Sequence, residues 1–240
     1  MNLSVQAGSP IPVLVWLVQE TDFHGLLLIG IGPRQTFGNG DSHERASGLY
    51  LRRYEQWKSS PAKRSEAILD ELLGRRFASR GPSVDLDMLI HTAMVGRPLT
   101  PPFVAMRHGR WLELDDEVPG AFVEAQLSAT KRTTPATPAG KKQRVEAFVA
   151  LTRILEERGA TVVFVHHPTS GGVEDYETEH WPREEFFDRL PLKTGLPALH
   201  HEDDPRTAEL VPVDGSHLGR SDAPIYTEAL LSRLDALQSR

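Results

Sequence analysis

The chain has 240 residues, of which 39% are hydrophobic, and this is enough to build one α/β domain around a single core. Its net charge of -6 argues against nucleic-acid binding, which usually requires a basic face or tail. The lack of cysteine excludes disulfides, thiolate chemistry and Cys-ligated metal sites. No stretch approaches the roughly 20 apolar residues that span a bilayer, and no signal-peptide pattern opens the chain, so the sequence as written predicts a soluble, cytoplasmic protein.

The first half of the chain predicts helices around one buried strand. A turn of Gly-Ser-Pro precedes a short helix over residues 11–20. Residues 25–31 are a continuous apolar run ended by Gly-Pro, which is typical of a parallel strand covered on both faces. Helices follow over residues 42–58, where apolar side chains recur on one side, and over residues 62–77.

Residues 96–140 break this pattern. They contain six prolines, a predicted hairpin around His108 and Gly109, and a polar run from residue 128 to residue 140. We interpret the segment as an irregular insertion over the sheet, with residues 131–140 flexible.

The second half returns to alternating helices and strands. A helix over residues 141–158 precedes a buried strand over 161–165, and a weaker strand over 198–200 precedes a terminal helix over 225–237. Short apolar strands separated by helices predict a parallel sheet, with the strands 25–31, 161–165 and 198–200 as neighbours in that order. The whole chain, 1–240, is predicted to form one domain.

Two histidine pairs lie at the ends of predicted strands. They are His166-His167 and His200-His201, and the second pair is followed by the acidic run 202–204. Open α/β sheets bind ligands at this edge. Because neighbouring strand residues point to opposite faces, each pair is expected to offer one inward side chain at most. A metal site needs three or four converging ligands, which is more than these pairs are expected to supply. We therefore predict polar residues at the sheet edge, with no metal and no cofactor.

Asp214 and His217 are the main candidates for chemistry. They stand three residues apart in the turn Val-Asp-Gly-Ser-His-Leu, just before the predicted terminal helix. A carboxylate so placed can hold an imidazole in the tautomer that a general base needs. The alternative is a structural turn, in which Asp214 caps the backbone and His217 packs near the helix start.

These residues carry a resemblance to a known family. Asp-Gly-Ser-His-Leu at 214–218, before a terminal helix, resembles the last conserved block of the SGNH (GDSL-type) hydrolases. Asn-Leu-Ser-Val-Gln-Ala-Gly-Ser-Pro at 2–10 resembles the second block, where a strand runs into an oxyanion loop. The segments at 162–168 and 181–184 resemble those of uncharacterised bacterial members. The resemblance spans most of the chain in order.

The resemblance implies a flavodoxin-like, three-layer α/β/α fold with a parallel sheet, and a Ser-His-Asp triad. In that triad His217 takes the proton of a serine, Asp214 orients the imidazole, and the Gly8 backbone N–H meets the oxyanion. It also implies a small-molecule or carbohydrate ester as substrate, cleaved by hydrolysis or acyl transfer. We expect His217 and Gly8 to lie on the same, C-terminal edge of the sheet.

The chain departs from the family pattern in two places. In the family, the block with the nucleophilic serine precedes the segment that corresponds to residues 2–5, whereas here only Met1 precedes it. We therefore expect the first strand and the serine to be missing. We also expect residues 2–5 to be loosely held and the chain to be nearly inactive. After residue 31 the family has Gly-x-Asn-Asp, and this chain has Gly-Pro-Arg-Gln. Gly-Asp-Ser occurs at 40–42, but before a helix, so Ser42 is interpreted as part of a helix cap rather than as a nucleophile.

Three interpretations stay open at this point. The first is an SGNH-like ester hydrolase or acyl-group transferase. The second is a non-catalytic SGNH-like protein that binds a ligand or partner at the same edge. The third is a degenerate fragment with no independent function. The pattern predicts no oligomeric state.

Overall fold

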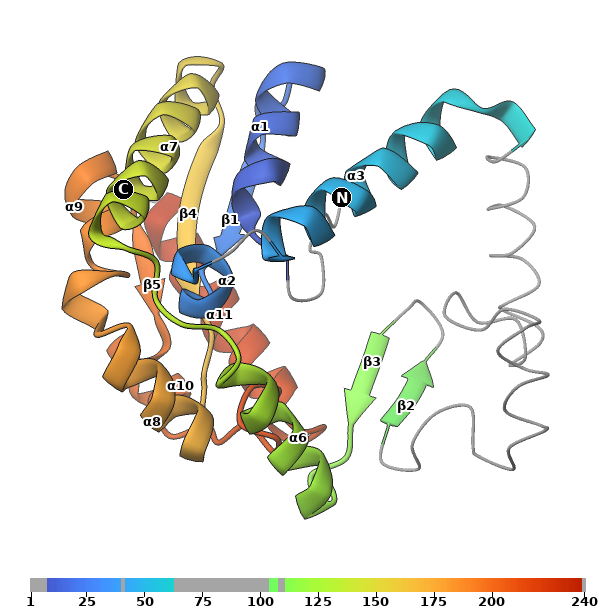
Figure 1. Ribbon diagram of the computed structural model, residues 1–240, viewed down its shortest axis with the longest axis vertical. Coiled ribbons are helices and arrows are strands. Elements are labelled where there is room, and N and C mark those ends of the chain that lie inside the picture. Colours follow the sequence, from blue (N-terminus) through green and yellow to red (C-terminus); the bar gives the residue numbers. More distant parts are fainter. Residues whose placement is uncertain (1–7, 40–41, 63–103, 108–110, 239–240) are drawn as a thin grey trace.

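The centre of the fold is a parallel sheet. The computed structural model describes residues 8–39, 42–62, 104–107 and 111–238 (Figure 1). Three parallel strands run in the order β1 (Leu26–Gly30), β4 (Thr161–His166) and β5 (Ala198–His200). The predicted strands, their direction and their order are confirmed, and the chain is an α/β protein.

The central strand β4 separates two apolar cores, because its side chains alternate between the faces of the sheet. Val162 and Phe164 pack into the larger core with residues of α1 (Pro10–Glu20) and α7 (Pro138–Glu157). Val163 and Val165 pack instead with Leu234 of α11 (Asp222–Gln238). Figure 1 shows α7 in front of β4 and α11 behind it. Helices therefore cover both faces of β4, as its continuous apolar sequence predicts.

The long helices begin close to the predicted positions. Ser9 caps α1 by accepting a hydrogen bond from the N–H of Ile11 at 3.4 Å. Thr137 caps α7 in the same way, with Gly140 as the donor at 3.2 Å. The helix α3 spans Ser42–Ser59, within one residue of its predicted end. The predicted helix at 62–77 lies outside the described residues apart from residue 62, and the predicted loose end at 2–5 also lies outside them.

The insertion is more regular than predicted. Its hairpin is confirmed, with β2 (Val104–Arg107) antiparallel to β3 (Trp111–Leu114). An additional helix, α6, spans Gly120–Thr130 and was not predicted. Figure 1 places the hairpin and α6 at one end of the sheet, beside the loops that leave its C-terminal edge.

The prediction that residues 131–140 are flexible is wrong. The N–H of Asn39 donates to the carbonyl of Thr134 at 2.6 Å, and the N–H of Ala136 donates to the carbonyl of Phe37 at 2.9 Å. These bonds tie the segment to the loop after α2 (Pro33–Phe37), and residues 138–140 are the first turn of α7. The sequence misled because a Pro-rich polar run can be ordered by long-range backbone pairing.

The region after β4 contains short helices that were not predicted. They are α8 (Gly171–His180), α9 (Arg189–Thr194), α10 (Pro205–Ala208) and the 3-10 turns η2 (Arg183–Glu185) and η3 (His201–Asp203). Among the described helices, none has the length and apolar character needed to cross a membrane.

Candidate functional site

Asp214 and His217 form a hydrogen-bonded pair in the turn before α11. The Nδ1 atom of His217 lies 2.8 Å from Oδ2 of Asp214. The Asp214 side chain is fully buried, whereas that of His217 is 51% exposed. Because the carboxylate accepts the hydrogen bond, Nδ1 carries the proton and Nε2 is left as the basic nitrogen of the ring. The structure thus combines the two sequence-predicted residues in the arrangement of a general base and its orienting acid.

The carboxylate of Asp214 also organises the turn itself. Its Oδ1 atom accepts the backbone N–H groups of Ser216 at 2.9 Å and His217 at 2.8 Å. Gln126 of α6 donates to Oδ2 at 3.3 Å. Burial raises the pKa of Asp214, but the hydrogen bonds and charge of His217 and the bond from Ser216 outweigh it and lower the pKa below its ordinary value. Asp214 is therefore ionised at neutral pH, and it serves both the turn and the imidazole.

Gly215 allows this turn to form. Its φ of +91° is in the left-handed region, and a Cβ there would lie 2.7 Å from Cγ2 of Val173. The turn closes with the N–H of Val213 donating to the carbonyl of His217 at 2.8 Å. A residue with a side chain at position 215 would push the turn away from α8.

The other sequence-predicted site residues lie elsewhere or have other roles. Gly8 is half-buried and directly precedes Ser9, whose N–H donates to the carbonyl of His43 in α3 at 3.0 Å. Its place beside His217 stays a prediction. Ser42 is exposed and is the first residue of α3, so it does not lie on a turn after a strand. Ser216 Oγ is 3.0 Å from Nδ1 of His217, on the side of the ring opposite the basic nitrogen.

A second cluster contains three buried histidines at the C-terminal edge of the sheet. His166 ends β4, His200 ends β5, and the two residues are register partners whose rings stack 4.3 Å apart. His201 begins η3, and its Nδ1 lies 3.4 Å from Nδ1 of His166. One ring nitrogen from each of the three lies within 4.8 Å of the others.

The expectation that each pair offers one inward histidine is therefore wrong for His200 and His201. The chain leaves the extended conformation after His200, so the alternation of a strand does not continue to His201. The expectation holds for the first pair, because His167 is exposed and its Nδ1 lies 2.7 Å from the hydroxyl of Tyr226.

The three histidines line a cavity of about 230 Å³ together with charged side chains. Burial lowers the pKa of each imidazole, that of His200 to about 3, so all three are neutral near pH 7. Glu177 of α8 lines the same cavity, and burial raises its pKa to about 7 in spite of the nearby Arg34. Within the described part of the chain, Oε2 of Glu177 has no hydrogen-bond partner.

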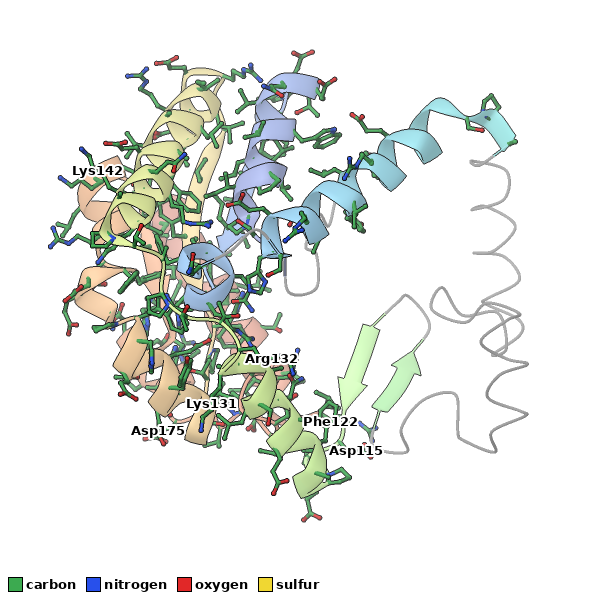
Figure 2. The ribbon with its side chains drawn as sticks, viewed as in Figure 1. Asp115, Phe122, Lys131, Arg132, Lys142 and Asp175 are labelled. Carbon is green, nitrogen blue, oxygen red and sulfur yellow. The ribbon has the colours of Figure 1, made fainter. Side chains whose placement is uncertain are left out.

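Two larger cavities lie away from the histidine cluster. One of about 550 Å³ is bordered by Leu218, Leu114 of β3 and Ala223 of α11, so it adjoins the turn that contains His217. Another of about 660 Å³ is an apolar groove between α7 and α9, rimmed by lysines such as Lys142, which Figure 2 shows on the outer side of α7.

Sequence reasoning found the Asp214–His217 pair and missed the convergence of the histidine cluster. The signal was present, since two His-His pairs end neighbouring strands, but the turn into η3 could not be foreseen from alternation alone. Comparison of the chain with protein-family models, curated proteins and solved structures found no match in any of the three.

Proposed function

We propose that the chain is an SGNH-like ester hydrolase or acyl-group transferase in which His217 is the general base and Asp214 orients it. The observation that carries the proposal is the 2.8 Å bond between a fully buried carboxylate and Nδ1 of a half-exposed imidazole. A carboxylate with no exposed surface is costly to keep ionised unless it is fully hydrogen-bonded, as Asp214 is. The bond leaves Nε2 as the basic nitrogen of a side chain that is 51% exposed.

We also propose the flavodoxin-like, three-layer form of the α/β fold. The support is the division of the apolar side chains of β4 between a core with α1 and α7 and a core with α11. In such open sheets the ligand lies outside the carboxyl ends of the strands. The turn with Asp214 and His217 is held there, because the N–H of Ser170, four residues beyond the end of β4, donates to the carbonyl of Gly215.

In the proposed reaction, Nε2 of His217 accepts the proton of an oxygen nucleophile as that oxygen attacks the acyl carbonyl. The imidazolium then returns the proton to the leaving oxygen, and Asp214 stays ionised throughout. The family resemblance assigns the nucleophile to a serine and the oxyanion contact to the Gly8 N–H. The cavity of about 550 Å³ beside Leu218 offers room for an acyl or sugar group next to the turn.

An activated aryl ester tests the histidine separately from the serine, because water activated by Nε2 of His217 can attack its carbonyl and the leaving group departs without acid assistance. We expect the 240-residue chain to hydrolyse p-nitrophenyl acetate slowly but faster than buffer. His217→Ala should lower the protein-dependent rate by about 10²-fold or more, and Asp214→Asn should lower it with the turn still formed. His24→Ala is the matched control, since His24 is exposed and contacts only the carbonyl of Asp22 among the described bonds.

An acetylated oligosaccharide offered together with a free acceptor sugar then separates the two reactions. Free acetate indicates hydrolysis, and acetylated acceptor indicates transfer. If the wild-type chain and His217→Ala hydrolyse the aryl ester equally, the catalytic proposal is wrong. That result, combined with saturable binding of the oligosaccharide, would favour the non-catalytic ligand-binding protein.

A further inference from the structure

We propose that His166, His200 and His201 bind one divalent transition-metal ion, of the class of Zn²⁺, Co²⁺ or Ni²⁺, at the C-terminal edge of the sheet. This site is separate from the Asp214–His217 pair. Imidazole nitrogen is a preferred ligand of these ions, and three protein ligands with one open position are a common coordination set.

The distance between His166 and His201 fits an ion better than it fits a direct hydrogen bond. Their Nδ1 atoms are 3.4 Å apart, longer than the ~2.7–3.2 Å of good N–H hydrogen bonds. In a tetrahedral site with metal–nitrogen bonds of about 2.0–2.1 Å, two ligand nitrogens are about 3.3 Å apart. The third nitrogen, from His200, lies within 4.8 Å of the other two, and Nδ1 of His200 accepts the backbone N–H of Glu202 at 3.3 Å. The His200 ring must therefore move for all three nitrogens to reach one ion.

The backbone around the cluster is held firmly by bonds that do not use the facing nitrogens. Arg233 of α11 donates to the carbonyl of His200 at 2.7 Å. The hydroxyl of Thr207 donates to the carbonyl of His201. Register pairing between β4 and β5 fixes His166 opposite His200. Ligands mounted on rigid elements in this way lose little conformational entropy when an ion binds.

The charges around the cluster favour a cation. Two guanidinium groups lie near the cluster: Arg233 donates to the carbonyl of His200, and Arg183 is bonded to Asp188, Glu202 and Asp203 at 2.7–3.2 Å. Three carboxylates and two guanidiniums leave one net negative charge among these groups. The cavity also contains the buried carboxyl of Glu177, whose Oε2 is unpartnered among the described residues. A polar occupant such as a metal-bound water would give that oxygen a partner.

The test is uptake of Zn²⁺ by the full chain. The affinity tag is first cleaved off, bound metal is removed with a chelator, and the chelator is then removed. Isothermal titration should show one ion per chain, and Co²⁺ should give the visible absorption of a tetrahedral site. His166→Asn and His201→Asn should each weaken binding by more than the ~10–100-fold that loss of a supporting partner costs. His24→Ala, at an exposed position, should bind as the wild type does.

A second measurement uses only the wild-type chain, so it does not depend on whether the variants fold. In the folded wild-type chain, the ring ¹⁵N resonances of the three histidines should shift on addition of Zn²⁺, while those of His24 and His180 stay in place. The proposal is overturned if the wild-type chain takes up no stoichiometric ion, or if both asparagine variants fold and bind as tightly as the wild type. It is equally overturned if the shifts fall on other histidines.

Discussion

The backbone N–H of Ser170 donates to the carbonyl of Gly215 at 3.1 Å, which joins the loop after β4 to the turn that contains Asp214 and His217. The hydroxyl of Ser170 adds a second bond, to the carbonyl of Pro212 at 2.7 Å. The Asp–His pair is thereby held near the end of the buried central strand, which also carries His166. The short segment between β4 and α8 therefore holds the Asp–His pair, whereas the histidine cluster is held by β4, β5 and η3.

Asp214→Asn should lower the free energy of unfolding by about 1.5–3 kcal/mol at pH 7, because it weakens charge-assisted bonds to two backbone N–H groups and to His217. The comparison is Asp175→Asn on α8, where the side chain is exposed, as Figure 2 shows. Urea denaturation of both variants measures the difference. Equal stability of the two would mean that Asp214 does not hold the turn.

The stability difference between the wild type and Asp214→Asn should depend on pH. The folded-state pKa of Asp214 lies below its ordinary value of 3.8, so its stabilising effect is present above pH 3.8 and disappears as the pH falls through the folded pKa. The gap between the wild type and Asp214→Asn should therefore shrink in acid. A gap that widened as the pH fell would contradict this assignment.

Gly219→Ala should loosen the contact between the hairpin and the turn. A Cβ at Gly219 would lie 2.5 Å from Oδ1 of Asp116, 3.0 Å from Cγ1 of Val213 and 3.1 Å from the Cα of Asp116, so the Asp116 side chain must move and its neighbours must give way. Overpacking of this kind costs about 1–3 kcal/mol. Gly48→Ala in α3 is the matched control, because a Cβ there meets nothing within 4 Å and alanine favours a helix by ~1 kcal/mol.

Thermal melting separates the two glycine variants. The melting temperature should fall for Gly219→Ala and rise slightly for Gly48→Ala. If the melting temperature of Gly219→Ala does not fall, a side chain is tolerated at position 219 and the close approach there does not constrain this end of the fold.

Phe164→Ala should be among the most damaging core substitutions. Phe164 has no exposed surface and meets Phe148 of α7 edge to face at 5.8 Å. Removing a fully buried phenyl ring costs about 3–5 kcal/mol, since a cavity remains between the sheet and α7. Leu192→Ala, at a position 77% exposed, should change the unfolding free energy by less than ~0.5 kcal/mol. Chemical denaturation of both variants checks the contrast.

Much of the fold was predictable from local pattern. The strands β1, β4 and β5 are short apolar runs that end in turn residues, and the parallel sheet follows from the helices between them. The helix α8 was missed because it begins at Gly171, where φ is +55°, and because its only fully buried apolar side chain is that of Val173. With so narrow an apolar face, its stability depends on tertiary contacts that sequence periodicity does not reveal.

The candidate site was predictable only where its residues are close in sequence. Asp214 and His217 are three residues apart, so their pairing could be expected from a single turn. The histidine cluster needs the register of β4 against β5 and the change of backbone at His201, and both depend on long-range packing. The buried Glu177 likewise becomes visible only when α8 is placed over the end of the sheet.

Glu177→Gln should stabilise the protein in alkaline solution and have little effect in acid. Burial raises the folded-state pKa of Glu177 to about 7 from the ordinary 4.5, so the folded state holds the proton more tightly than the unfolded state. The resulting stability is fully present below pH 4.5 and is lost as the pH rises through 7. A neutral glutamine avoids that loss, which is worth about 1–3 kcal/mol for a shift of this size.

The measurement is the melting temperature of the metal-free chain at a series of pH values from below to above the folded-state pKa of Glu177. The two proteins should melt together at the acid end, and Glu177→Gln should melt higher at the alkaline end. Glu179→Gln, which changes an exposed carboxylate on the same helix, should follow the wild type throughout. A constant offset between Glu177→Gln and the wild type at every pH would mean that the pKa of Glu177 is the same in the folded and unfolded states, which its burial beside the histidine cluster argues against.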